Sequence, residues 1–178
     1  MSIFYLTNNQ TSISRVANSL DKIFQSSRVI KLINGYYIVI NSLTNNQCNY
    51  KRTKLGYIFW FGTIFNQKGF AENALSEVED LASFKKAQEI GLFGHYQIII
   101  LENKKIYMIN DKIGMLNVYY TNEGGCNYLS NDLLSISIGS RCVELSEYPV
   151  KQFSLNESSV GVNTIFKNIS RLFIGNYL

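Results

Sequence analysis

GYIFWFGTIFN, residues 56–66, is the stretch on which the fold prediction depends. It is rich in aromatic and β-branched residues, a composition typical of a buried strand. Further along the chain, YQIIILEN (residues 96–103) and KIYMIND (residues 105–111) flank a turn at Asn103-Lys104, which predicts a hairpin. NVYYTNEGGCNYLSND, residues 117–132, predicts a second hairpin that turns at its Glu-Gly-Gly sequence.

The chain before this stretch begins with SIFYL, residues 2–6, a short apolar run that predicts an opening strand. Apolar residues then recur at helical spacing between residues 13 and 24, and Thr11 or Ser12 is available as the N-cap. RVIKLINGYYIVIN, residues 28–41, contains two β-rich runs around Asn-Gly, the strongest short-range signal of a hairpin.

A polar, basic connection runs from residue 42 to residue 54 and holds the one tight basic group of the chain, Lys51, Arg52 and Lys54. We expect a solvated loop here rather than a phosphate-binding patch, because a nucleic-acid binder concentrates its cations on one face.

Residues 73–90 change to helical spacing, with an apolar stripe and an acidic group on its other side. The stripe predicts a helix from Leu75 through Val78 to Leu81 and Ala82, and Ser83 is a candidate cap for a second short helix that ends at residue 90. A further short helix is expected over residues 132–137. For residues 147–178 the pattern predicts no particular element.

Length and composition predict one globular domain over residues 1–178. Of the 178 residues, 46% are hydrophobic and 17% are charged, which excludes a disordered chain. No run approaches the ~20 apolar residues of a membrane span, so we expect no membrane partner and a cytoplasmic location. Hairpins dominate and helices occur in few places, so the order of elements predicts an α+β domain with mostly antiparallel sheet.

Several cofactor classes lack their sequence signatures. The three cysteines, Cys48, Cys126 and Cys142, show no CxxC spacing, which excludes a zinc knuckle and suits a reducing compartment. His95 is the single histidine, so a multi-histidine metal site cannot form, and we expect a strand-edge residue rather than a catalytic base. No glycine-rich phosphate loop occurs. We therefore expect no cofactor, no metal and, with a net charge of +4, no nucleic acid.

From Trp60 onward, five segments in order resemble the glutaminase domain of the asparagine synthetase family, a class II glutamine amidotransferase domain with an N-terminal nucleophile. FGTIFN, residues 61–66, resembles the family's NGEIYN strand. Three further segments are LFGHY at residues 92–96, DKIG at residues 111–114 with Leu116, Tyr119 and Tyr120, and Leu129-Ser130 before a short helix. The fifth is the spacing of Phe153, Thr164, Ile169, Leu172, Gly175 and Leu178.

The resemblance implies a four-layer αββα sandwich of two mainly antiparallel sheets, the N-terminal nucleophile hydrolase fold. In that family a Cys that follows Met1 attacks the side-chain amide of glutamine, and its own α-amine is the base. An Asn side chain and a Gly backbone N–H then stabilise the oxyanion.

Carried over position by position, the resemblance implies a degenerate site. Ser2 stands at the nucleophile position, and Phe61, Gly62 and Thr63 stand at the positions of the family's Asn, Gly and Glu, so only the glycine is retained. Arg28 does not lie in the family's H-R-G-P-D context, and the glutamine-binding G-D-[ST]-[DE] segment is missing.

We therefore expect a scaffold or substrate-docking domain that has lost glutamine hydrolysis. The resemblance implies as partner an ATP-dependent, amide-forming synthetase domain in the same or a neighbouring chain, with a peptide as possible substrate and an oligomer left open. Two alternatives remain: an active amidohydrolase with Ser2 as nucleophile, and a stand-alone module that binds a peptide strand at an open sheet edge.

Overall fold

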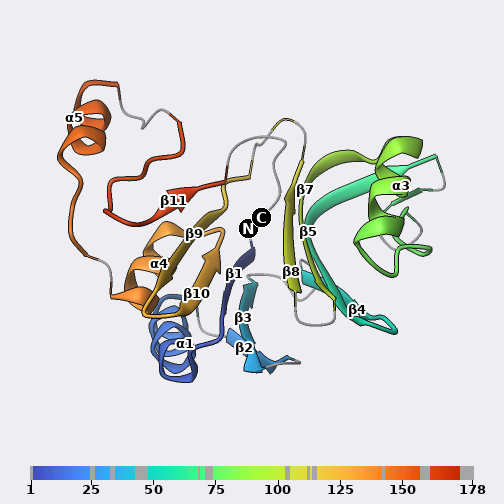
Figure 1. Cartoon of the computed structure of the whole chain (residues 1–178), viewed down its shortest axis with the longest axis horizontal. Helices are drawn as coiled ribbons and strands as arrows, with labels where there is room; N and C mark the ends of the chain where they lie inside the picture. Colours follow the sequence, from blue (N-terminus) through green and yellow to red (C-terminus); the bar gives the residue numbers. More distant parts are fainter. Residues whose placement is uncertain are drawn as a thin grey trace. The chain divides into compact units, whose positions relative to one another are not determined.

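A computed structural model gives the structure of most of the chain, and the description covers residues 2–24, 27–32, 35–42, 48–67, 69–70, 74–102, 105–111, 113, 116–141, 143–156 and 161–172. These residues form two compact units, each built on one sheet (Figure 1). Unit 1 contains Ser2 and the described residues between 44 and 116. Unit 2 contains those between 3 and 43 and between 117 and 172.

The sheet of unit 1 has the strand order β4-β5-β7-β8, and a short strand β6 pairs with the end of β5. Its strands are β4 (Cys48–Arg52), β5 (Gly56–Asn66), β6 (Gly69–Phe70), β7 (Phe93–Glu102) and β8 (Lys105–Asn110). β5 and β7 are antiparallel over ten residue pairs, and β7 and β8 form the expected hairpin, whose turn at residues 103–104 lies outside the description. The prediction of a long strand over residues 56–66 is confirmed.

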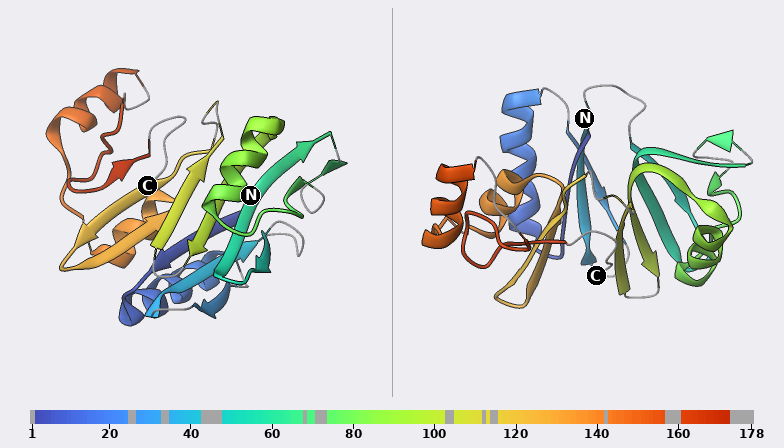
Figure 2. Two further views of the ribbon diagram at one scale, coloured as in Figure 1. Left: turned by 45° about the vertical axis from the view of Figure 1, so that its right-hand side comes forward. Right: turned by 90° about the horizontal axis from the view of Figure 1, so that it is seen from above.

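Helix α3 (Leu81–Gly91) packs on one face of this sheet, as Figure 2 shows from two sides. On that face Phe84 of α3 meets alternate residues of the strands, among them Trp60 and Ile98. The opposite face of the central strands is buried as well, since Phe59 and Ile99 are fully inaccessible to solvent. β5 and β7 are therefore buried on both faces, which explains why their sequences are continuously apolar rather than alternating.

The sheet of unit 2 has the strand order β11-β9-β10-β1-β3-β2. Its strands are β1 (Ser2–Thr7), β2 (Ser27–Lys31), β3 (Tyr37–Ser42), β9 (Tyr119–Glu123), β10 (Cys126–Ser130) and β11 (Ser170–Arg171), and its helices are α1 (Gln10–Phe24), α4 (Leu133–Ser140) and α5 (Glu147–Asn156). Both predicted hairpins, β2–β3 and β9–β10, are present and antiparallel.

Helices α1 and α4 share a core with one face of the unit 2 sheet. Tyr5 lies at its centre, fully buried, with its hydroxyl on the Ser12 hydroxyl of α1. Ser12 donates in turn to the carbonyl oxygen of Gly139 in α4 at 2.9 Å. Burial raises the pKa of Tyr5 far above its ordinary value of 10.0. This chain of hydroxyl groups ties β1 to both helices.

Two expectations about helix starts are wrong. α1 begins earlier than expected, and Asn9 caps it by accepting the backbone N–H of Ser12 at 3.1 Å; neither Thr11 nor Ser12 is the cap. α3 begins only at Leu81, because Asp80 accepts the N–H of Ser83 and starts the helix there. Ser83 is thus the third helical residue of a capping box rather than the cap.

The polar connection is also not simply a solvated loop. Its second half forms strand β4, which pairs with β5 from Cys48↔Phe61 to Arg52↔Tyr57. The turn between β4 and β5 is stabilised by Thr53, whose hydroxyl accepts the N–H of Gly56 at 3.0 Å. Beyond residue 146 the structure forms α5 and β11, where the sequence predicted no particular element. Among the described residues no helix is long and apolar enough to cross a membrane.

Candidate functional site

The three positions that correspond to the family's Asn-Gly-Glu lie in the middle of β5. The side chain of Phe61 is buried, with 2% of it exposed, whereas Gly62 and Thr63 are exposed. Across the ladder, Thr63 faces His95 of β7. The buried hydrocarbon ring of Phe61 cannot donate a hydrogen bond, whereas the backbone of Gly62 carries an N–H group.

Gly62 adopts a conformation that favours glycine. Its φ is +87°, and a Cβ atom would lie 2.2 Å from the carbonyl oxygen of His95. Gly94 on β7 repeats the arrangement in the opposite direction, with a φ of +117° and a Cβ position 2.1 Å from the oxygen of Thr63. Two glycines on neighbouring strands thus permit a close approach of the two backbones that any side chain would prevent.

Residues that follow β8 in the chain lie close to Gly62. The side-chain amide of Asn110 donates to the carbonyl oxygen of Leu116 at 2.7 Å. The Cδ1 atom of Leu116 lies 3.3 Å from the Cβ position of Gly62, so this residue packs beside the glycine. Asp111 is buried and accepts the N–H of Ile113 at 2.9 Å, while its own N–H donates to the oxygen of Tyr96. Of the D-x-x-G segment, Asp111 and Ile113 lie within the described residues, and the same part of the chain brings Leu116 beside Gly62.

A row of buried polar side chains crosses the sheet beside Phe61. Gln97 pairs with Phe61 on one side and with Asn110 on the other, and both carboxamides are at least 96% buried. Tyr96, on the other face, has its pKa raised by burial and further by the nearby charge of Asp111. Gln97 and Asn110 were not predicted as site residues from the sequence, although each is a polar residue in an apolar strand.

Ser2 is the first residue of β1 and groups with unit 1, which also contains residues 61–63. Its side chain and Met1 lie outside the described residues. The chemistry that residues 61–63 themselves offer is donation from the Gly62 backbone, with the Thr63 hydroxyl exposed beside it.

The described residues contain no group of three or more His, Cys, Asp or Glu side chains that could hold a metal ion. His95 is exposed on β7. Cys126 is a free, half-buried thiol, and the side chains of Cys48 and Cys142 are outside the description.

The residues of the two remaining motifs whose side chains are described are buried in unit 2. The Leu129-Ser130 segment precedes Asn131, whose side chain accepts the N–H of Phe4 at 2.9 Å. Thr164 is buried, and its hydroxyl donates to the oxygen of Ile169 at 2.8 Å. Gly175 and Leu178 lie outside the described residues. The described positions therefore stabilise the backbone of unit 2.

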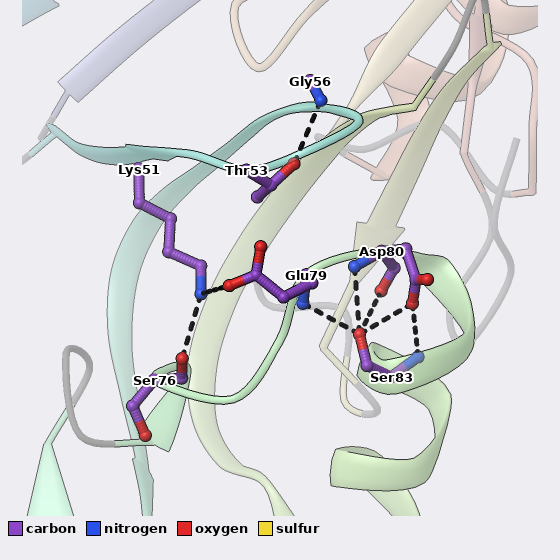
Figure 3. A network of polar contacts seen from close by, with 7 residues as sticks. All are labelled: Lys51, Thr53, Gly56, Ser76, Glu79, Asp80 and Ser83. Carbon is purple, nitrogen blue, oxygen red and sulfur yellow. Dashed lines mark hydrogen bonds and ion pairs between the residues drawn. The ribbon is translucent and has the colours of Figure 1, made fainter.

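In the basic group, Lys51 makes contacts within unit 1 (Figure 3). Lys51 of β4 donates to the carbonyl oxygen of Ser76 at 3.1 Å and lies 3.4 Å from the carboxylate of Glu79. Next to it, the backbone N–H and the hydroxyl of Ser83 lower the pKa of Asp80 below its ordinary value of 3.8. Lys51 therefore connects the segment before α3 to the sheet of unit 1.

No protein-family model matches this chain, and a search of curated proteins finds no match either. The resemblance to the glutaminase domain therefore depends on the motifs alone and stays a prediction.

Proposed function

We propose that this chain is a catalytically degenerate glutamine amidotransferase-like domain that serves as scaffold or substrate-docking domain for an ATP-dependent, amide-forming synthetase domain. The observation that carries the proposal is the contrast between two adjacent residues of β5. Gly62 keeps a positive φ and leaves no space for a side chain, while Phe61 beside it is apolar and buried. A position that still requires glycine, next to a position whose polar side chain has been replaced, is the pattern expected when a fold persists after its catalytic activity is lost.

The proposed fold is the four-layer αββα sandwich. Its support comes from each unit by itself. In unit 1, Ile58 and Phe59 project to opposite faces of β5 and both are fully buried. In unit 2, Phe4 and Tyr5 do the same on β1. Helices account for one face of each sheet, α3 in unit 1 and α1 with α4 in unit 2, and a sheet buried on both faces requires a second covering layer.

A second candidate is an active amidohydrolase with Ser2 as nucleophile. It is favoured by one observation, that Ser2 groups with the unit that holds Gly62. In this candidate the N-terminal amine takes the hydroxyl proton after removal of Met1, and the Gly62 N–H stabilises the oxyanion with no side-chain donor beside it. Loss of one such donor costs about 3 kcal/mol of transition-state stabilisation, so the expected activity is low.

Release of ammonia from glutamine and asparagine separates the two candidates. The natural protein is used after mass spectrometry has established whether Met1 is removed, and Ser2→Ala is the matched control. The degenerate domain predicts that both proteins stay at the background rate. Ammonia release above background that Ser2→Ala abolishes would overturn the scaffold proposal.

Phe61→Asn sharpens this assay, because it restores the side-chain donor at the position where the family has one. If Ser2 and Gly62 still form a site, the variant releases ammonia about tenfold faster or more than the natural protein. If the site is degenerate throughout, the variant remains at background, and its circular dichroism spectrum serves as the control for folding.

A further inference from the structure

Three exposed phenylalanines form a row across one end of the unit 1 sheet. Phe65 of β5 pairs with Phe70 of β6 on one side and with Phe93 of β7 on the other. Directly opposed residues of antiparallel strands point to the same face of a sheet, so the three rings share one face. The ring centroids of Phe65 and Phe70 lie 6.1 Å apart, and those of Phe65 and Phe93 lie 6.0 Å apart. These three residues are called the phenylalanine row below.

The phenylalanine row lies on the face of the sheet that is turned away from α3. Ile64, which precedes Phe65 in β5, packs in the core under α3, so Phe65 points to the other face. The row is open to solvent, with 40% of Phe65, 71% of Phe70 and 56% of Phe93 exposed. The ring of Phe93 lies against the end of α3, because its Cε2 atom is 3.1 Å from the Cβ position of Gly91. Contacts therefore hold the exposed rings in place.

The exposed area of the phenylalanine row suits a short ligand. A phenylalanine side chain offers about 200 Å² of surface, so the exposed fractions amount to roughly 330 Å² in total. An apolar patch of this size on a monomer is often functional. A stable pair of protein copies buries about 800 Å² on each partner, which is more than twice this area. A second copy of the chain is therefore a poor occupant, whereas a segment of a few residues fits.

Two exposed polar residues lie beside the phenylalanine row. Thr63 of β5 pairs with His95 of β7, and each stands two residues from the row on the same face. Among the described residues, none is hydrogen-bonded to the Thr63 hydroxyl or to the His95 ring. None of the five residues in the two rows is Lys, Arg, Asp or Glu. The rows therefore lack the cations that a nucleic acid or an anionic membrane surface requires.

We propose that this face of unit 1 binds an extended peptide with an apolar residue on the phenylalanine row and, two positions along, an uncharged polar residue on Thr63 and His95. Residues i and i+2 of an extended chain lie about 7 Å apart on the same side, which matches the spacing of the two rows along β5 and β7. A hydrocarbon ligand would cover the rings but make no hydrogen bond to Thr63 or His95, so a peptide is the better occupant.

This inference rests on the substrate-docking role proposed above and gives the docked substrate a chemical class. Titration of the full chain with an uncharged peptide, followed by the NMR shifts of the backbone amides, tests it. The probe is acetylated and amidated and has the core Phe-Ser-Asn between Gly-Ser flanks. It is expected to shift the amides of Phe65, Phe93 and His95 together. A control peptide with the core Ser-Ser-Asn leaves these amides in place.

One variant tests the apolar half of the contact. Phe70→Ala removes the most exposed ring of the phenylalanine row and is expected to weaken binding of the Phe-Ser-Asn peptide about fivefold. The circular dichroism spectrum of the variant serves as the control for folding. Leu155→Ala is the matched control for binding, because it removes an 82% exposed apolar side chain from α5 of unit 2 and leaves binding unchanged.

Thr63→Val tests the polar half of the contact. Valine keeps the shape of threonine but has no hydroxyl group, so binding of the Phe-Ser-Asn peptide is expected to weaken about threefold. A peptide with the core Phe-Ser-Ala has no polar group for Thr63, so it binds the variant and the natural chain equally. An equal response of the two peptides would overturn the assignment of the polar residue to Thr63.

The whole proposal is overturned if the Phe-Ser-Asn peptide shifts none of the three amides at millimolar concentration, or if Phe70→Ala binds it as well as the natural chain. It is also overturned if 1-octanol shifts these amides and the peptide does not, because the row then binds hydrocarbon. None of these results depends on ammonia release, so loss of the docking site and failure of the degenerate-domain proposal are separated by different measurements.

Discussion

Units 1 and 2 are both built on antiparallel sheets, yet the chain assembles them differently. In unit 1, β5 pairs with β7, the next long strand of the chain, and β8 follows directly. In unit 2, β1 lies between β3 and β10, and Tyr5 pairs with Ser130. The pairing of β1 with β10 closes the long loop of chain between these two strands, and closing such a loop costs conformational entropy before any contact forms. Unit 1 can therefore form from local pairs, whereas unit 2 needs both parts of the chain at once.

The interiors of the two units also differ. The core of unit 1 under α3 is apolar, and its tightest point is the approach of two backbones at Gly62 and Gly94. Unit 2 instead holds a buried chain of hydroxyl groups from Tyr5 through Ser12 to the backbone of Gly139. A backbone contact cannot move aside, but a side-chain contact can, so substitutions in the two units should differ in cost.

Gly62→Ala tests the backbone contact of unit 1 and has the largest expected effect. The new Cβ would lie 2.2 Å from the oxygen of His95 at a φ of +87°. We expect a loss of about 3 kcal/mol in the free energy of unfolding, measured by urea denaturation. Gly124→Ala is the control, since its φ is +57° with nothing near its Cβ position, and about 1 kcal/mol is expected. Equal costs for the two variants would contradict the close approach.

Gly139→Ala tests the side-chain contact of unit 2. Alanine in a helix normally stabilises by up to about 1 kcal/mol relative to glycine. Here the Cβ would lie 1.9 Å from the hydroxyl oxygen of Tyr5, so we expect a loss of about 2 kcal/mol, seen as a lower thermal midpoint.

The matched background for this variant is Tyr5→Phe, which removes the hydroxyl group. In that background Gly139→Ala should cost clearly less than in the natural chain, and the double-mutant cycle measures the difference. If the costs of Gly139→Ala and Tyr5→Phe are additive, the absence of a side chain at Gly139 is not required by the hydroxyl of Tyr5.

Asp80→Asn tests the cap of α3 through its pH dependence. The pKa of Asp80 is lowered in the folded chain, so its contribution is present above the ordinary value of 3.8 and is lost as the pH falls through the lowered value. Asn still caps the helix, and solvent screening limits the difference at neutral pH to about 0.5 kcal/mol. Urea denaturation from about pH 6 to about pH 2 should show this difference vanishing at the acid end. A constant difference would contradict it.

Lys51→Ala has the smallest expected effect. The ion pair with Glu79 is partly exposed, with side-chain exposures of 24% and 50%. We expect a loss of about 0.5 kcal/mol, part of which high salt should screen. Lys54→Ala, in the turn that follows β4, provides a lysine control. A loss above about 2 kcal/mol would mean that the contact with Ser76 stabilises unit 1 far more than a surface pair does.

The sequence predicted most strands of both units. It did not predict where the helices begin, because this depends on which side chain caps each helix. The aromatic and β-branched run of β5 and the turn signals of the three hairpins were sufficient for those elements. The start of α3 was misplaced because Leu75 and Val78 have helical spacing but pack in the core ahead of the helix. Asp80 decides where the helix begins through its contacts with Ser83.

For the candidate site, the sequence by itself determined which residue types stand at positions 61–63 and that Phe61 carries no donor. Only the tertiary structure decided why position 62 requires glycine, because its constraint is the carbonyl of His95 on a neighbouring strand. It also decided that Lys51 contacts Ser76 and that Phe65 lies between Phe70 and Phe93. Spacing along a chain encodes local geometry, whereas the partners of a backbone group or a cation come from segments that meet only after folding.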